Sequence, residues 1–381
     1  MTDRDATTLP FDTDAMLARL RPWIECESPT YDPEAVNRML ALAARDAEAM
    51  GATAEVIANP GRFGDSLRVR FPHPDHDKVP GILVSGHFDT VHPVGTLAKN
   101  PWRIEGGRLY GPGTQDMKGG NLALLEAAAM LHRQGWRTPL PVTFLFTPDE
   151  EVGTPETRDL IETEAKKNAA VLLAEPAETC GAATTGRYAI ARFDLETRGI
   201  PSHAGWALKD GRSAIAEMAR RILEIEAMTT EDCTFSVGVI HAGQWVNCVA
   251  SSCRAEVLSM AKRQEDLDGG VAALLALSGT RNGVEFTVTR TVTRPVWPPE
   301  LPGTMRLYQV ARGIAARLGF ELTHCNSGGG SDGNFTGALG IATLDGLGLR
   351  GAGLHTLDEH IEIDSLTERA KLAAALFMEI R

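Results

Sequence analysis

The stretch "GILVSGHFDTVHPVG", residues 81–95, joins a short apolar run to a histidine and an acid. The run at residues 81–86 has the length and apolar character of a buried strand. Alternate residues of a strand point to the same side, so His87 and Asp89 can share one pocket at its carboxyl end. The stretch therefore predicts a buried strand that delivers polar side chains to one edge of a sheet.

The segments that follow repeat this arrangement. Apolar runs of strand length lie at residues 141–146 and 169–176, and helical patterns lie at residues 33–50, 117–135 and 157–167. Short, continuous apolar strands that alternate with helices are typical of a buried parallel sheet. We therefore predict an α/β fold with a largely parallel sheet and helices on both of its faces.

A second pattern begins near Gly186, where strand-like segments alternate apolar and polar residues as half-exposed strands do. From residue 188 to residue 291 the expected order is strand, helix, two strands, helix and strand, which is the order of a split βαβ (ferredoxin-like) unit. We predict a larger domain formed by residues 1–185 and 295–381, and an inserted α+β domain formed by residues 186–294.

Length, charge and cysteine usage limit the function classes. The chain has 381 residues, more than one typical domain of about 100–200 residues. Its net charge of -12 disfavours binding along a nucleic-acid backbone. No stretch reads as a signal peptide or as a membrane span, and the six cysteines form no CxxC pair. We expect a soluble, cytoplasmic protein that binds neither nucleic acid nor membranes.

Acidic and histidine residues follow each expected strand of the larger domain. The carboxyl ends of parallel strands meet at one edge of a sheet, so these side chains should converge. Carboxylates that share one crevice repel each other unless a cation holds them. Imidazoles and carboxylates without a thiolate suit zinc or a similar divalent ion, and a bridging carboxylate suits a pair of ions. The candidates are His87, Asp89, Asp116, Glu150, Glu151, Glu175 and His355.

Each of these signals has a structural explanation when it is taken singly. A lone histidine is usually a satisfied structural group, and adjacent acids such as Glu150 and Glu151 usually lie on a solvated loop. The order of the motifs is more specific. It runs from HxD through DMKGG, DEExG and AEP to a glycine-rich segment and a late histidine.

Over nearly the whole chain, this order resembles the two-metal aminoacylase and carboxypeptidase family, which includes glutamate carboxypeptidase, succinyl-diaminopimelate desuccinylase, peptidase T and acetylornithine deacetylase. The motifs are most similar to those of glutamate carboxypeptidase. The resemblance implies a metal-binding catalytic domain and a lid or dimerisation domain. It also implies two divalent ions, expected to be zinc, with cobalt or manganese as alternatives.

The resemblance assigns a role to each candidate. One ion is held by His87, Asp116 and Glu175, and the other by Asp116, Glu151 and His355, with Asp116 as the bridge. Glu150 falls at the general base, which takes a proton from the metal-bridged water and passes it to the leaving amine. Asp89 falls behind His87, where an acid orients the imidazole.

The inserted domain also carries motifs of the family. His203, in "GIPSHAG", is implied to stabilise the oxyanion and to reach the partner's site in dimeric relatives, so we expect a homodimer through this domain. Asn247 lies in "GQWVNCVA", with Ala250 where proline is usual. Backbone N–H groups of the glycine-rich segment at residues 326–332 can bind an anion. The expected substrate contacts are His203, Asn247, Arg294, Gly329, Gly330 and Ser331.

Met260 departs from the family pattern. Related carboxypeptidases have an arginine near this position that binds the substrate's terminal carboxylate, and a methionine cannot form that pair. Either Arg294 or Arg350 replaces the missing cation, or the substrate lacks an α-carboxylate there. The first alternative predicts hydrolysis of an N-acyl amino acid or a small peptide.

The second alternative predicts hydrolysis of a non-peptidic amide, such as an aromatic one. A third alternative is a binding homologue without catalytic activity. It is disfavoured because all five ligand positions and Glu150 are present.

Overall fold

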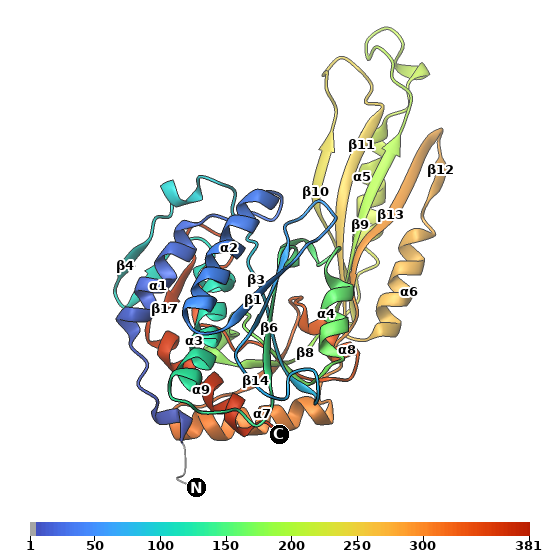
Figure 1. Cartoon of the computed structure of the whole chain (residues 1–381). Coiled ribbons are helices and arrows are strands. Elements are labelled where there is room, and N and C mark those ends of the chain that lie inside the picture. Colours follow the sequence, from blue (N-terminus) through green and yellow to red (C-terminus); the bar gives the residue numbers. More distant parts are fainter. Residues whose placement is uncertain (1–4) are drawn as a thin grey trace. The chain divides into compact units, whose positions relative to one another are not determined.

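The computed structural model describes residues 5–381, which form two compact units (Figure 1). Unit 1 comprises the chain up to Gly186, together with Pro299–Ser327 and Ser331–Arg381. Unit 2 comprises Arg187–Pro298 and the three glycines Gly328–Gly330. The sequence placed the two domain boundaries after residues 185 and 294, and the units divide after Gly186 and Pro298.

The central sheet of unit 1 has six strands in the order β1-β2-β6-β3-β7-β15. The pairs β6–β3, β3–β7 and β7–β15 are parallel, and the pairs β1–β2 and β2–β6 at one edge are antiparallel. The bounds are β1 Thr53–Ile57, β2 Ser66–Arg70, β3 Gly81–His87, β6 Val142–Thr147, β7 Asn168–Leu173 and β15 Ala342–Leu344. The parallel strands confirm the predicted α/β fold.

Both faces of this sheet are covered by helices. Ile82 and Val84 of β3 belong to a large core together with side chains of α1, α2, α3, α7 and α9. Leu83, on the opposite face, belongs to a smaller core with Ile161 and Ala165 of α4. Every residue of β3 is therefore buried, as the continuous apolar run predicts. The helices are α1 Thr13–Glu25, α2 Pro33–Ala49, α3 Gly119–Arg133, α4 Arg158–Ala165, α7 Pro302–Leu318, α8 Gly333–Ala338 and α9 Asp364–Glu379.

Two smaller sheets complete unit 1. One has the order β16-β17-β5-β4, and the other pairs β14 with β8. Their bounds are β4 Arg103–Glu105, β5 Arg108–Tyr110, β16 Gly351–Ala352, β17 His360–Glu362, β8 Ala183–Arg187 and β14 His324–Ser327. The pairing of β17 with β5 brings the loop that follows β16 close to the segment that precedes α3.

Unit 2 contains one antiparallel sheet in the order β10-β11-β9-β13-β12, with α5 and α6 packed on it. Its elements are β9 Ala189–Arg198, α5 Ala214–Glu226, β10 Cys233–Ala242, β11 Ser252–Ala261, α6 Gln264–Leu275, β12 Gly279–Arg281 and β13 Val284–Arg294. Apart from the short β12, this is the expected order of a split βαβ unit. No helix among residues 5–381 is long and apolar enough to cross a membrane.

Candidate metal centre

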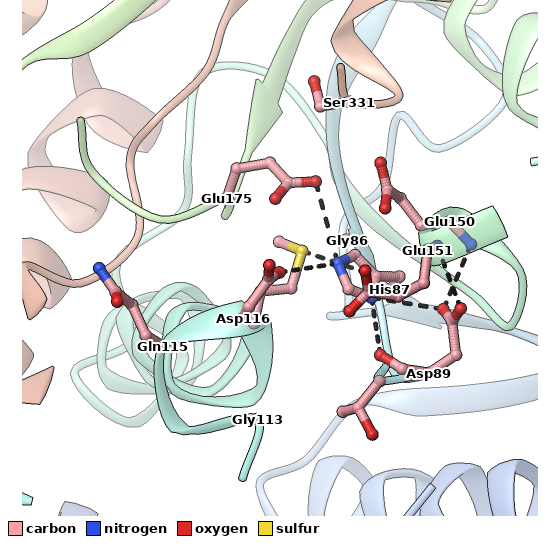
Figure 2. Close-up of polar contacts among 12 residues, drawn as sticks. Gly86, His87, Asp89, Gly113, Gln115, Asp116, Glu150, Glu151, Glu175 and Ser331 are labelled. Carbon is pink, nitrogen blue, oxygen red and sulfur yellow. Dashed lines mark hydrogen bonds and ion pairs between the residues drawn. The ribbon is translucent and has the colours of Figure 1, made fainter. Parts of the chain in front are cut away.

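Four of the five predicted metal ligands, His87, Asp116, Glu151 and Glu175, lie together with Glu150 at the carboxyl edge of the central sheet (Figure 2). His87 is the last residue of β3, Glu150 and Glu151 follow β6 in a short 3-10 helix, and Glu175 follows β7. Asp116 lies just before α3 and faces the same place. Parallel strands and one helix start therefore supply these side chains, as the sequence predicts.

Asp116 lies between two histidines. Its Oδ1 is 3.1 Å from His87 Nε2, and its Oδ2 is 3.2 Å from His355 Nε2. Glu175 Oε1 is 4.0 Å from His87 Nε2, and Glu151 Oε2 is 3.3 Å from His355 Nε2. Each oxygen of Asp116 thus faces a different pair of one histidine and one glutamate.

Two groups among the described residues have donor atoms close enough to hold an ion. In each group the donor atoms lie within 4.8 Å of one another. One group is His87, Glu150 and Glu175, and the other is His87, Asp116 and Glu151. Glu150, which the sequence assigns to proton transfer, therefore has a carboxylate oxygen within 4.8 Å of donor atoms of His87 and Glu175.

Burial and negative charge shift the pKa values of the glutamates. Burial and the charge of Asp116 raise the pKa of Glu151 to about 8. Burial, together with the charge of Glu150, raises the pKa of Glu175 well above its usual range. Both shifts express the cost of gathering carboxylates away from water, which a divalent cation removes.

The histidines and Asp116 shift in the direction of mutual charge stabilisation. Burial opposes the ionisation of Asp116, but its hydrogen bonds to His355 and His87 lower its pKa below the usual range. Hydrogen bonds to Asp116 and Glu151 raise the pKa of His355 to about 10. Burial would lower the pKa of His87, but hydrogen bonds to Asp116 and Asp89 outweigh it and raise the pKa.

The donor set fits a divalent cation. Imidazole nitrogens and carboxylate oxygens are the ligands that zinc and similar ions take in catalytic sites. In addition, Oε1 of Glu151 is buried and has no hydrogen-bond partner among the described residues. A buried carboxylate oxygen without a donor is costly, and a metal ion is one group that would satisfy it.

Asp89 contacts several residues of the centre and holds them in position. The Nδ1 of His87 lies 2.9 Å from the carbonyl oxygen of Asp89 and 3.3 Å from its Oδ1, and these contacts direct the other nitrogen of the ring toward Asp116. The same carboxylate accepts hydrogen bonds from the backbone N–H groups of Glu150 and Glu151, at 3.3 Å and 3.2 Å. The hydroxyl of Thr30 donates a further bond to it at 2.8 Å. Asp89 therefore positions one histidine and both glutamates.

Glu359 is a site residue that sequence reasoning missed. Its buried carboxylate accepts hydrogen bonds from the backbone N–H groups of Gly113, Gln115 and Asp116, at 2.9, 2.9 and 3.1 Å. His92 Nε2 lies 2.8 Å from the same carboxylate. Glu359 thus anchors the loop that presents Asp116. Glu359 follows His355 by four residues and His92 follows His87 by five, so their nearness to the motifs was the available signal.

Two glycines of the motifs allow helix α3 to approach the ends of β3 and β7. A Cβ on Gly86 would lie 2.0 Å from Oδ1 of Asn121, and a Cβ on Gly120 would lie 2.2 Å from the carbonyl oxygen of Ala174. Asn121 also donates a hydrogen bond of 2.7 Å to the carbonyl of His87. The close approach brings the segment that carries Asp116 to the strand ends.

Most of the chain matches a known family. Residues 83–379 match the sequence profile of Peptidase family M20/M25/M40. The chain belongs to this family. Membership confirms the relationship predicted from the order of the motifs, and it makes the chain a metal-dependent hydrolase of peptide or amide bonds.

Curated and structural relatives support the assignment to M20/M25/M40. Carboxypeptidase G2 of Pseudomonas sp. (strain RS-16) is 32% identical over 316 residues, which cover 78% of this chain and 74% of the relative. Succinyl-diaminopimelate desuccinylase of Stutzerimonas stutzeri (strain A1501) is 27% identical over 311 residues, covering 76% and 80%. The crystal structure of a tripeptidase from Staphylococcus aureus subsp. aureus Mu50 has a TM-score of 0.78 at 21% identity, covering 96% and 98%, which shows the shared fold.

Five of the six expected substrate contacts of this M20/M25/M40 chain lie in unit 2, in two groups. His203 and Asn247 lie on neighbouring exposed loops, joined by a 2.9 Å bond from the Ala204 N–H to the Asn247 carbonyl. The ring of His203 stacks on Trp206, with centroids 4.6 Å apart. The structure therefore brings His203 and Asn247 close together.

Arg294 and the glycine-rich segment form the second group. Arg294 is buried, and a Cβ on Gly330 would lie 3.0 Å from its Cδ. Gly329 accepts a hydrogen bond of 2.8 Å from Arg187. Ile190 of β9 pairs with Met260 on one side and with Arg294 on the other. Met260 and Arg294 therefore lie in one row on the same face of the sheet.

Arg350 and Ser331 form ion pairs or hydrogen bonds with other residues of unit 1. Arg350 forms ion pairs with Glu362, at 2.9 Å, and with Glu368. The hydroxyl of Ser331 is buried, donates a hydrogen bond of 2.6 Å to Asp345 and accepts one from Gly333. Ser331 thus fixes the end of the glycine-rich segment, and its part in substrate binding stays a prediction.

Proposed function

We propose that this chain hydrolyses the amide bond of an N-acyl amino acid or a small peptide at a centre of two divalent metal ions bridged by Asp116. The observation that carries the proposal is that the two carboxylate oxygens of Asp116 face different histidines. One oxygen lies 3.1 Å from His87 and the other lies 3.2 Å from His355. A carboxylate placed in this way is suited to bridge two ions. The same geometry would have no purpose in a binding protein that holds no metal.

The proposed ligand sets are those that the resemblance to the family implies, and they differ from the two groups of donor atoms that lie within 4.8 Å of one another. His87, Asp116 and Glu175 would hold one ion, and Asp116, Glu151 and His355 the other. We expect zinc, with cobalt or manganese as alternatives, because all three accept nitrogen and oxygen ligands. When bound, such ions activate water at neutral pH and polarise the carbonyl of the amide.

Glu150 is the proposed general base. It is 8% exposed, and one of its carboxylate oxygens lies within 4.8 Å of donor atoms of His87 and Glu175. The bond from its backbone N–H to Asp89 holds the residue in place. From this position Glu150 takes a proton from the attacking water and returns it to the nitrogen of the leaving amine.

Arg294 is the proposed partner of the substrate's α-carboxylate. It lies in the same row of the unit 2 sheet as Met260, the position near which related carboxypeptidases have an arginine. Gly330 lies against its side chain, so backbone N–H groups of the glycine-rich segment can assist in holding an anion. Arg350 is a weaker candidate because two glutamates already pair with it.

A homodimer through unit 2 is part of the proposal. Trp206, Trp245 and Val246 are 90%, 67% and 104% exposed, on the two loops that carry His203 and Asn247. Exposed large apolar side chains that gather in one region are typical of a protein interface. We also propose a cytoplasmic location, which suits the buried thiols Cys233 and Cys253.

Replacement of Glu150 tests the proposed reaction. We expect Glu150→Ala to retain its fold and its metal content and to lose roughly 10²–10⁴-fold in kcat toward N-acyl amino acids. Glu162→Ala, which removes a glutamate paired with Arg158 on α4, is the matched control and should retain activity. Near-normal kcat in the Glu150 variant would contradict the assigned role.

A substrate panel separates the two substrate alternatives. It contains N-acyl amino acids with a free α-carboxylate and the same amides with that group blocked. The role proposed for Arg294 predicts a strong preference for the free acids. A preference for the blocked compounds would favour the non-peptidic alternative instead, with Met260 marking an altered pocket.

A further inference from the structure

A pocket of about 490 Å³ lies in unit 1, between the segments at residues 29–32 and 90–94 and the pair Glu151–Val152. Its volume is within the range of small-molecule sites, about 300–1,000 Å³. Most of its wall is apolar. The apolar and aromatic residues that line it are Pro29, Tyr31, Val91, Pro93, Val94 and Val152.

Several of the apolar side chains that line the pocket are exposed to water. Tyr31, Val91 and Val94 are 74%, 40% and 61% exposed. Large apolar side chains grouped around one depression are more typical of a binding site than of ordinary surface. They are therefore available to a ligand rather than buried by the fold.

The walls are fixed by backbone pairing. Pro29 forms an isolated parallel bridge with Thr90. The N–H of Thr30 donates to the carbonyl of Thr90 at 3.2 Å, and the N–H of Thr90 donates to the carbonyl of Ser28 at 2.9 Å. Asp32 caps helix α2 through the N–H of Ala35. The pocket is thus preformed, which lowers the entropy cost of binding.

The pocket shares residues with the metal centre. Glu151 lines it and has a carboxylate oxygen 3.3 Å from His355. Thr30, on the opposite wall, donates a hydrogen bond to the Asp89 carboxylate behind His87. A substrate group that fills the pocket would therefore lie beside Glu151, next to the site proposed for the amide bond.

The charges of the pocket select which half of a substrate it accepts. Its lining contains the carboxylates of Asp32 and Glu151 and no lysine, arginine or histidine. A substrate carboxylate would find no cationic side chain of the lining to pair with, and Asp32 would repel it. The amino-acid half of an N-acyl amino acid carries a carboxylate, so the lining favours the acyl half.

We propose that this pocket binds the acyl group of the substrate and selects uncharged, apolar acyl groups, such as an aromatic one, over acyl groups that carry a carboxylate. The inference rests on the proposed amide hydrolysis and adds the substrate class. In this proposal, unit 1 binds the apolar acyl half of the substrate, and Arg294 binds the half that carries the carboxylate.

Hydrolysis of three matched compounds tests this selection. The metal-loaded protein is assayed with N-benzoyl-, N-acetyl- and N-succinyl-L-alanine, which differ only in the acyl group. We expect kcat/KM for the benzoyl compound to exceed that for the succinyl compound by at least about tenfold. Equal values, or a preference for the succinyl compound, would overturn the proposal.

A charge introduced into the pocket sharpens the test. Val94→Arg should lower the ratio of benzoyl to succinyl kcat/KM by about tenfold or more, since it adds a cation and fills apolar space. Val56→Arg is the matched control, because Val56 is 56% exposed on β1 and does not line the pocket. Metal content and circular dichroism check that both variants remain intact. An unchanged ratio in Val94→Arg would contradict the proposal.

The two proposals can fail separately. If no N-acyl alanine is hydrolysed, the proposed function fails, and the same compounds then serve as unreacted ligands in calorimetry. Tighter binding of the benzoyl compound than of the succinyl compound, lost in Val94→Arg and kept in Val56→Arg, supports the pocket. Equal binding of the two compounds overturns it.

Discussion

The metal centre of unit 1 and the loops of unit 2 that carry His203 and Asn247 differ in how their polar groups are held. In the centre, His87 is 1% exposed and Asp89 0%, and each is bonded to other buried groups. In unit 2, His203 and Asn247 are exposed, and the His203 ring contacts mainly Trp206 and the N–H of Gly205. The polar groups of the metal centre are held by one another, whereas those of the unit 2 loops are open to solvent.

The comparison predicts its largest effect at His203. We expect His203→Ala to lower kcat by roughly 10²–10³-fold, as the loss of one oxyanion donor does. Its metal content should not change, because His203 is not among the proposed metal ligands. Metal analysis and steady-state kinetics together check this. Lys209→Ala, an exposed cation in the same segment, should keep normal kcat. Loss of metal in the His203 variant would break the distinction between the two regions.

A smaller effect is expected at Arg294. Arg294→Ala should lower kcat/KM for an N-acyl amino acid with a free α-carboxylate by about 10²-fold, since one partner of a charged pair is lost. The corresponding α-amide should be affected only slightly. Arg350→Ala should change neither substrate by more than about twofold, because its two glutamates already occupy it. Equal losses for the acid and the amide would argue against carboxylate binding by Arg294.

Glu359 should show the smallest effect, on metal affinity rather than on turnover. Glu359→Gln weakens acceptance of the three N–H bonds that hold the loop of Asp116. We expect metal affinity to fall by about 10–100-fold, as for other residues that orient ligands, with kcat largely restored at saturating metal. Competition with a fluorescent chelator measures the affinity. Glu362→Gln, an exposed acid of β17, is the control. Wild-type affinity in the Glu359 variant would show that Asp116 needs no such anchor.

Much of the centre was predictable from sequence because parallel strands bring their carboxyl ends to one edge. The apolar run that ends at His87, and those that precede Glu150 and Glu175, identify both the strands and the residues at their ends. The DMKGG motif places Asp116 at the start of a helix. Local patterns are sufficient where topology alone determines which side chains meet.

The remaining features depend on contacts between distant segments. Glu359 bonds the N–H of Asp116 across 243 residues, and Thr30 bonds Asp89 across 59 residues. Neither hydrogen bond produces a sequence pattern from which it could be predicted. The division of the Asp116 oxygens between His87 and His355 also depends on the loop after β16, whose path is set by the pairing of β17 with β5. Likewise, the acyl pocket forms only where residues 29–32 meet residues 90–94.

Anomalous diffraction from crystals of the zinc-loaded protein tests the central claim most directly. Data collected at the zinc edge locate each ion relative to Asp116. We expect two peaks, one near His87 and Glu175 and one near His355 and Glu151, with an Asp116 oxygen directed at each. A single peak, or peaks away from Asp116, would contradict a two-ion centre bridged by this carboxylate.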